Sequence, residues 1–262
     1  MNFSGSIVPA LLLTVAAGLC TGVGSAIAYF IRKPKMAYLA FLLGFSAGVM
    51  IYVSFMELLP SALQAVGKLW SLAAFFAGIA AMGLVDILVP ELEHPNQWQT
   101  AECEDEPAAN LEKSRLMRTG LFTALAIGIH NFPEGLATFT SALTDVHLGI
   151  FIAIAIAIHN VPEGIAVSVP ILYATGNRNK AFFYSFLSGM SEPAGAIVGY
   201  LILLPFLTPA LLAALLAFVA GVMVYISLDE LLPMAHRYGH GHLVIAGVVL
   251  GMLVMAVSLL IL

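Results

Sequence analysis

Long apolar runs, each near the length of a membrane-spanning helix, constrain this 262-residue chain more than any other feature. A helix crosses the hydrocarbon core of a bilayer with about 20 mostly apolar residues. Only 10% of the residues are charged, whereas soluble domains carry about 25%. So few charges could not cover a soluble surface, and the sequence predicts an all-α integral membrane protein that forms one polytopic domain over residues 1–262. We expect eight transmembrane helices, at about 7–31, 36–60, 69–90, 116–141, 147–173, 180–204, 208–233 and 242–262.

The basic residues predict the orientation of these spans. Nine of the ten Lys and Arg residues lie in or beside loops that follow odd-numbered spans, and Lys68 alone lies on the other side. Cytoplasmic loops carry an excess of Lys and Arg. We therefore expect the odd-numbered loops in the cytoplasm, both termini outward, and a long acidic cytoplasmic loop at about 91–115.

Two segments occur twice in the chain. Residues 45–62 match residues 218–235 at 12 of 18 positions, and residues 130–138 resemble 159–167. A weaker similarity links Gly18–Ile31 with Gly189–Ile202. The members of each pair lie an odd number of spans apart, so they cross the membrane in opposite directions. This pattern predicts an inverted-topology repeat in a 3+2+3 arrangement, as in secondary transporters with a midplane site. The alternative is chance similarity among apolar helices.

Polar residues that are costly inside a bilayer gather in the fourth, fifth and sixth predicted spans. His130 and Glu134 are four residues apart, as are His159 and Glu163, so each pair shares one helix face. By their distance from the ends of the predicted spans, His130, His159 and Glu192 lie near the middle of the membrane. The set is His130, Asn131, Glu134, His159, Asn160, Glu163 and Glu192.

This set has the chemistry of a transition-metal site. Imidazole suits Zn, Fe, Cu and Ni, and carboxylate and amide oxygens extend the range to Mn. Pro133 and Pro162 interrupt the hydrogen bonding of their helices and are expected to kink the fourth and fifth spans beside the ligands. The alternative interpretation is that His and Glu only join helices by hydrogen bonds.

The doubled motif, His130-Asn131-Phe132-Pro133-Glu134-Gly135 and His159-Asn160-Val161-Pro162-Glu163-Gly164, resembles the ZIP (Zrt/Irt-like) family of divalent metal transporters, and closely its bacterial zinc-uptake branch. The resemblance covers essentially the whole chain. It implies uptake of Zn²⁺, and also of Fe²⁺, Mn²⁺ and Cd²⁺, across the bacterial cytoplasmic (inner) membrane. It also suggests a homodimer.

The resemblance further implies a binuclear site between the fourth and fifth spans. One ion would be held by His130, Glu134, His159, Glu163 and, as a soft ligand, Met50. The second would be held by Asn131, Glu134, Asn160, Glu163 and Glu192. Family members vary at the positions of His159 and Asn160, so the identity of the metal does not carry over with the motif.

Other acids lie along the expected path of the ion. Glu57 near the outer end of the second span is an expected entrance acid, and Asp229 and Glu230 near the inner end of the seventh are expected exit acids. The alternative is that these charges are interfacial and extend to water. Asp86 has no assigned role. Metal capture on the cytoplasmic side is a further hypothesis, and a solvated acidic loop is its alternative. The residues concerned are Glu91, Glu93, His94, Glu102, Cys103, Glu104, Asp105, Glu106, His236, His240 and His242.

Several functions are excluded or disfavoured. A net charge of −5 argues against a nucleic-acid partner, and the absence of a Walker-type loop argues against ATP hydrolysis. Two cysteines are too few for a disulfide scaffold. An intramembrane metalloenzyme is the main alternative, but neither H-E-x-x-H nor E-x-x-H occurs around the cluster. We therefore expect a transporter without a catalytic cofactor; a metal sensor without flux is the third hypothesis.

Overall fold

The computed structural model describes residues 7–30, 36–88, 108–203, 206 and 208–261, and the regular elements in these ranges are helical. In chain order they are α1 (Ile7–Ala28), α2 (Met36–Val53), the π-helical turn η2 (Ser54–Leu58), α3 (Leu59–Leu88), α4 (Ala108–Thr144), α5 (Val146–Thr175), α6 (Arg178–Gly189), α7 (Ser191–Leu203), α8 (Pro209–Ile226), the π-helical turn η4 (Ser227–Leu231), α9 (Leu232–Arg237) and α10 (Gly241–Ile261).

Five helical runs among the described residues are long and apolar enough to cross a bilayer: Ile7–Ile27, Met36–Ile87, Val146–Thr175, Pro209–Arg237 and Gly241–Ile261. The second run has 52 residues and contains two predicted spans, because Gly67, at φ 78° and ψ 170°, interrupts the helix between them. The helices α6 and α7 have only 12 and 13 residues. The all-α class is confirmed, while the number of eight spans stays a prediction.

Prolines lie beside three other irregularities of the helices, whereas α4 and α5 continue through Pro133 and Pro162. The predicted span at 180–204 consists of α6 and α7, which meet at Met190. Pro193 lacks an N–H, and its ring clashes with the carbonyl four residues earlier, at Gly189, where α6 ends. The two π-helical turns lie just ahead of Pro60 and Pro233, and the wider turn accommodates a residue that cannot donate.

Polar side chains and glycine mark several helix ends. The Asp145 carboxylate accepts hydrogen bonds from the backbone N–H groups of His147 and Leu148 and begins α5, and Gly176 ends it in the left-handed conformation. The helix α4 begins at Ala108 rather than near residue 116, because the Ala-Ala-Asn-Leu-Glu-Lys stretch contains good helix formers.

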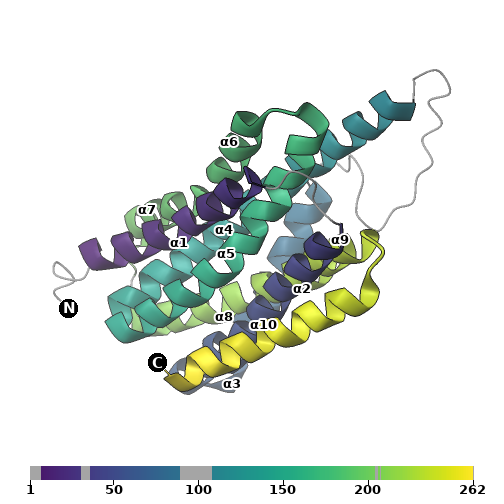
Figure 1. Cartoon of the computed structure of the whole chain (residues 1–262). Helices are drawn as coiled ribbons and strands as arrows, with labels where there is room; N and C mark the ends of the chain where they lie inside the picture. The colour runs from purple at the N-terminus through teal and green to yellow at the C-terminus, as the bar shows by residue number, and fades with distance from the viewer. Residues whose placement is uncertain (1–6, 31–35, 89–107, 204–205, 207, 262) are drawn as a thin grey trace.

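The helices α4 and α5 pack along each other in the middle of the bundle. In Figure 1 they lie between α1, α6 and α7 on one side and α2 and α10 on the other. The helix α3 packs along α8, α10 along α2, α1 along α5, and α7 along α4. The first helix begins and the last helix ends at the same end of the bundle (Figure 1). The central pair therefore has protein on both sides.

Two glycines of the central pair allow very close helix contacts. A Cβ atom at Gly135 of α4 would lie 1.9 Å from the backbone oxygen of Glu192 in α7. A Cβ atom at Gly164 of α5 would lie 2.0 Å from the backbone oxygen of Thr21 in α1. Small residues let membrane helices approach in this way. These contacts bring α1 and α7 against the polar residues of α4 and α5.

Candidate metal centre

The polar motif residues of α4 and α5 are completely buried. Each H-N-x-P-E-G motif has three polar side chains, and all six have no solvent exposure. They are His130, Asn131, Glu134, His159, Asn160 and Glu163. Glu192, in the first turn of α7, is equally buried. The structure therefore places these predicted residues in the protein interior, where a charged group must find a partner.

The two histidines and two glutamates form crossed pairs between the helices. The Nε2 atom of His130 in α4 lies 3.3 Å from Oε2 of Glu163 in α5. The Nε2 atom of His159 in α5 lies 3.3 Å from Oε2 of Glu134 in α4. Each histidine thus contacts the glutamate of the other helix, although the i,i+4 spacing places its own glutamate on the same face. The four side chains form one reciprocal group across the α4–α5 contact.

The asparagines connect this group to α1, α6 and α7. The Nδ2 group of Asn160 donates to the backbone oxygen of Ala17 at 2.9 Å and also to Oε1 of Glu192. The Nδ2 group of Asn131 donates to the backbone oxygen of Ser188 at 3.4 Å. Glu192 therefore belongs to the same polar group, as the sequence predicts. The carbonyl oxygens of Ala17 and Ser188 are partners that no side-chain motif indicates.

Many ligand atoms of this group have no hydrogen-bond partner. Buried polar atoms in proteins are normally paired. The unpaired atoms here are His130 Nδ1, Asn131 Oδ1, Glu134 Oε1, His159 Nδ1, Asn160 Oδ1 and Glu192 Oε2. So much unused coordinating capacity in one buried region is typical of a site that receives a cation.

The carboxylates of the two glutamates point toward the imidazoles of the two histidines. They do not point toward one common position where an ion could sit. Among the residues that the structure describes, no three His, Cys, Asp or Glu side chains converge closely enough to hold one ion together. The crossed pairs account for this, because each glutamate turns one oxygen toward the opposite histidine. Side-chain rotation would have to open these pairs for an ion to bind.

The second helix contributes one polar contact to the group. Ser46 of α2 is fully buried, and its hydroxyl donates to Oε1 of Glu163 at 3.2 Å. Met50, one turn further along α2, is fully buried among apolar side chains of the hydrophobic core. Ser46 is not among the residues predicted from the sequence, although a serine within an apolar helix segment is a signal for such a contact.

The expected entrance and exit acids lie in the two π-helical turns. Glu57 is partly buried in η2, where Ser61 donates to its Oε1 at 3.5 Å. Asp229 and Glu230 are partly buried in η4. π-Helical turns occur frequently at functional sites, so both segments stay candidates for roles along a path.

The remaining predicted residues fall into three groups. His236, His240 and His242 are exposed. Asp86 of α3 accepts a hydrogen bond from the Tyr225 hydroxyl at 3.2 Å. The acidic-loop residues Glu91, Glu93, His94, Glu102, Cys103, Glu104, Asp105 and Glu106 lie outside the described residues.

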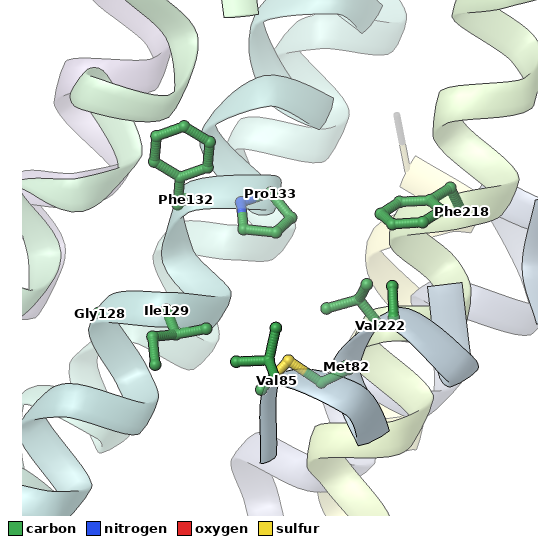
Figure 2. A pocket seen from close by; sticks show the side chains of 9 residues that line it. Met82, Val85, Gly128, Ile129, Phe132, Pro133, Phe218 and Val222 are labelled. Carbon is green, nitrogen blue, oxygen red and sulfur yellow. The ribbon is translucent and has the colours of Figure 1, made fainter. Parts of the chain in front are cut away.

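An apolar pocket of about 430 Å³ lies beside the centre, between α3, α4 and α8. Figure 2 shows Met82, Val85, Ile129, Pro133 and Val222 around this space. Its wall includes Pro133, which is adjacent in sequence to Glu134. The lining carries no carboxylate or imidazole, so the pocket is not part of the polar group.

Comparison with known proteins identifies relatives over nearly the whole length. The profile of the ZIP Zinc transporter family matches residues 87–259. The chain is 56% identical over 270 residues to "Zinc transporter ZupT" of Nitratidesulfovibrio vulgaris, with 98% of each chain covered. It is 53% identical to proteins of the same name from Clostridium perfringens, with 97% of this chain and 96% of that one covered, and from Streptococcus mutans, with 96% of each covered.

These matches decide between the classes of protein considered above. They exclude the intramembrane metalloenzyme alternative, because the matched family consists of transporters. The resemblance inferred from the doubled motif is confirmed: the chain is an integral membrane protein and belongs to the ZIP zinc transporter family.

Proposed function

We propose that this chain moves Zn²⁺ across the bacterial cytoplasmic membrane into the cytoplasm, and that Fe²⁺, Mn²⁺ and Cd²⁺ are further substrates. The observation that carries the proposal is the buried group of two crossed His–Glu pairs with unpaired ligand atoms around it. The similar proteins named zinc transporters support Zn²⁺ as the substrate. Imidazole and carboxylate ligands also suit Fe and Mn.

The proposed centre holds two ions. His130, Glu134, His159, Glu163 and Met50 would bind one ion, and Asn131, Glu134, Asn160, Glu163 and Glu192 the other, so that two glutamates bridge. The unpaired Nδ1 atoms of both histidines and the unpaired Oδ1 atoms of both asparagines support these two ligand sets. An entering ion would replace the crossed His–Glu contacts, and its charge would be offset by three carboxylates.

The proposed path runs from Glu57 at the outer side to Asp229 and Glu230 at the inner side. Their positions in equivalent π-helical turns, one in each copy of the longest repeat, support paired roles at the two ends. Carboxylates at a pore mouth attract cations and raise their local concentration.

The proposed architecture has eight spans in an inverted repeat, with both termini outward. Matching glycine contacts support it. Gly135 of α4 packs on α7, and Gly164 of α5 packs on α1, as expected if the repeat relates α4 to α5 and the first span to the sixth. Gly78 of α3 packs on Phe218, and Gly251 of α10 packs on Phe45, which is the Phe218 position in the other copy.

Uptake of Zn²⁺ by proteoliposomes tests the proposal. The variant with Glu134→Ala and Glu163→Ala together should lose uptake and also lose Zn²⁺ binding in detergent. The matched control is Asp145→Asn, which changes an exposed acid outside the centre but retains a capping side chain for α5. Equal uptake by the double variant and the parent would refute the proposal, whereas metal binding without flux in the parent would favour a sensor.

A further inference from the structure

Ser46 uses its hydroxyl differently from the other buried serine of the same segment. The hydroxyl of Ser54 donates to the backbone oxygen of Met50, four residues earlier, at 2.7 Å. The hydroxyl of Ser46 instead donates to Oε1 of Glu163 on α5, at 3.2 Å. Both side chains are fully buried. The Ser46 hydroxyl is therefore committed to a carboxylate of the polar group rather than to its own helix.

This hydrogen bond makes the two central glutamates unequal. Both oxygens of Glu163 are engaged, Oε1 by Ser46 and Oε2 by His130. Glu134 has Oε2 near His159, but its Oε1 is buried without a hydrogen-bond partner.

The two copies of the longest repeat differ at the position of Ser46. Residues 45–62 align with 218–235, and Val219 stands at the position of Ser46. A valine side chain cannot donate a hydrogen bond. One copy of the repeat therefore supplies a hydroxyl where the other copy supplies only a methyl surface, although 12 of the 18 aligned residues are identical.

We propose that Ser46 is a positioning residue that sets metal selectivity, because its hydroxyl occupies a lone pair of Oε1 of Glu163 and favours binding of the ions through Oε2 alone. The inference rests on the proposed transport function. Zn²⁺ in proteins is satisfied by about four ligands, whereas Mn²⁺ favours octahedral sites rich in oxygen. A glutamate that binds through one oxygen gives each ion one donor atom rather than two, and this difference favours Zn²⁺ over Mn²⁺.

The test compares the uptake of Zn²⁺ and Mn²⁺ by proteoliposomes, as kcat/KM for each ion. Ser46→Ala releases Oε1 of Glu163. The preference for Zn²⁺ over Mn²⁺ should fall about tenfold, as expected for the loss of one hydrogen bond to a charged group, while Zn²⁺ transport persists. Ser46→Thr retains a hydroxyl and should retain the preference. Ser54→Ala is the matched control and should leave the ratio unchanged.

Two outcomes would overturn the inference: a selectivity ratio in Ser46→Ala equal to that of the parent, or an equal loss of transport for both ions with the ratio preserved. If Ser46→Ala does not fold, Ser46→Cys replaces it, because a thiol is a weaker donor than a hydroxyl. The ratio of Zn²⁺ to Mn²⁺ transport should then lie between those expected for the parent and for Ser46→Ala. A ratio equal to that of the parent would count against the inference. Failure of the proposed function is distinguishable, since the parent itself would then transport neither ion.

Discussion

Replacing Gly135 with alanine tests whether the close packing of α4 on α7 holds the polar group together. A Cβ atom at this position would lie 1.9 Å from the carbonyl oxygen of Glu192 and 2.6 Å from its Cα. Ordinary contact begins at 3.4 Å, and the obstructing atoms are backbone, so α7 would have to move by about 1.5 Å, the difference between 3.4 and 1.9 Å. Overpacking of this kind typically costs about 1–3 kcal/mol.

The displacement would reach the ligands because Glu192 contacts Asn160. We expect Gly135→Ala to lower Zn²⁺ affinity; if the whole displacement were felt at the ligands, about 1.4 kcal/mol would correspond to a factor of about ten. Isothermal titration calorimetry in detergent measures the affinity, and thermal unfolding of the same sample measures the stability, which should also fall.

Gly128→Ala is the matched control on the same helix. A Cβ atom at Gly128 has its nearest neighbour, the Cα of Ser188, at 3.8 Å, an ordinary contact. Alanine also has a higher helix propensity than glycine, so Gly128→Ala should retain affinity and stability. Equal zinc affinity and equal unfolding temperature for the two variants would refute the packing argument.

Three further predictions concern protons, helix ends and orientation. Zn²⁺ affinity should decrease from neutral to mildly acidic pH, because metal ligands must be deprotonated; a flat calorimetric titration would contradict the His and Glu ligands. Thr208→Ala removes the hydroxyl that caps α8 and should lower stability by about 1 kcal/mol in thermal unfolding without changing Zn²⁺ affinity. In a protein whose Cys20 and Cys103 are replaced by serine, an impermeant thiol reagent should label intact cells at Asp145→Cys but not at Asn177→Cys; the reverse pattern would invert the proposed orientation.

The sequence predicts the membrane class and the residues of the polar group, because both depend on local patterns. Apolar length gives the spans, and the two H-N-x-P-E-G motifs identify His130, Glu134, His159 and Glu163. The crossed pairing of these side chains was not predictable, since it depends on how α4 and α5 are rotated against each other. Spacing within one helix contains no information on that rotation.

Two further features depend on contacts between distant segments. The division of one predicted span into α6 and α7 follows from Pro193, but an apolar stretch of suitable length conceals it. The role of Ser46 follows from α2 lying against α5, so that residues 117 positions apart form a hydrogen bond. Hydrophobic periodicity indicates which residues are buried and does not indicate which helix they meet.

A crystal structure of the protein soaked with Zn²⁺, with anomalous scattering measured at the zinc edge, tests the metal centre most directly. We expect two anomalous peaks between α4 and α5, with histidine nitrogens of His130 and His159 about 2.0–2.1 Å from an ion and both glutamates turned away from their crossed partners. Strong peaks elsewhere in the protein, with His130, Glu134, His159 and Glu163 still in their crossed pairs, would contradict it.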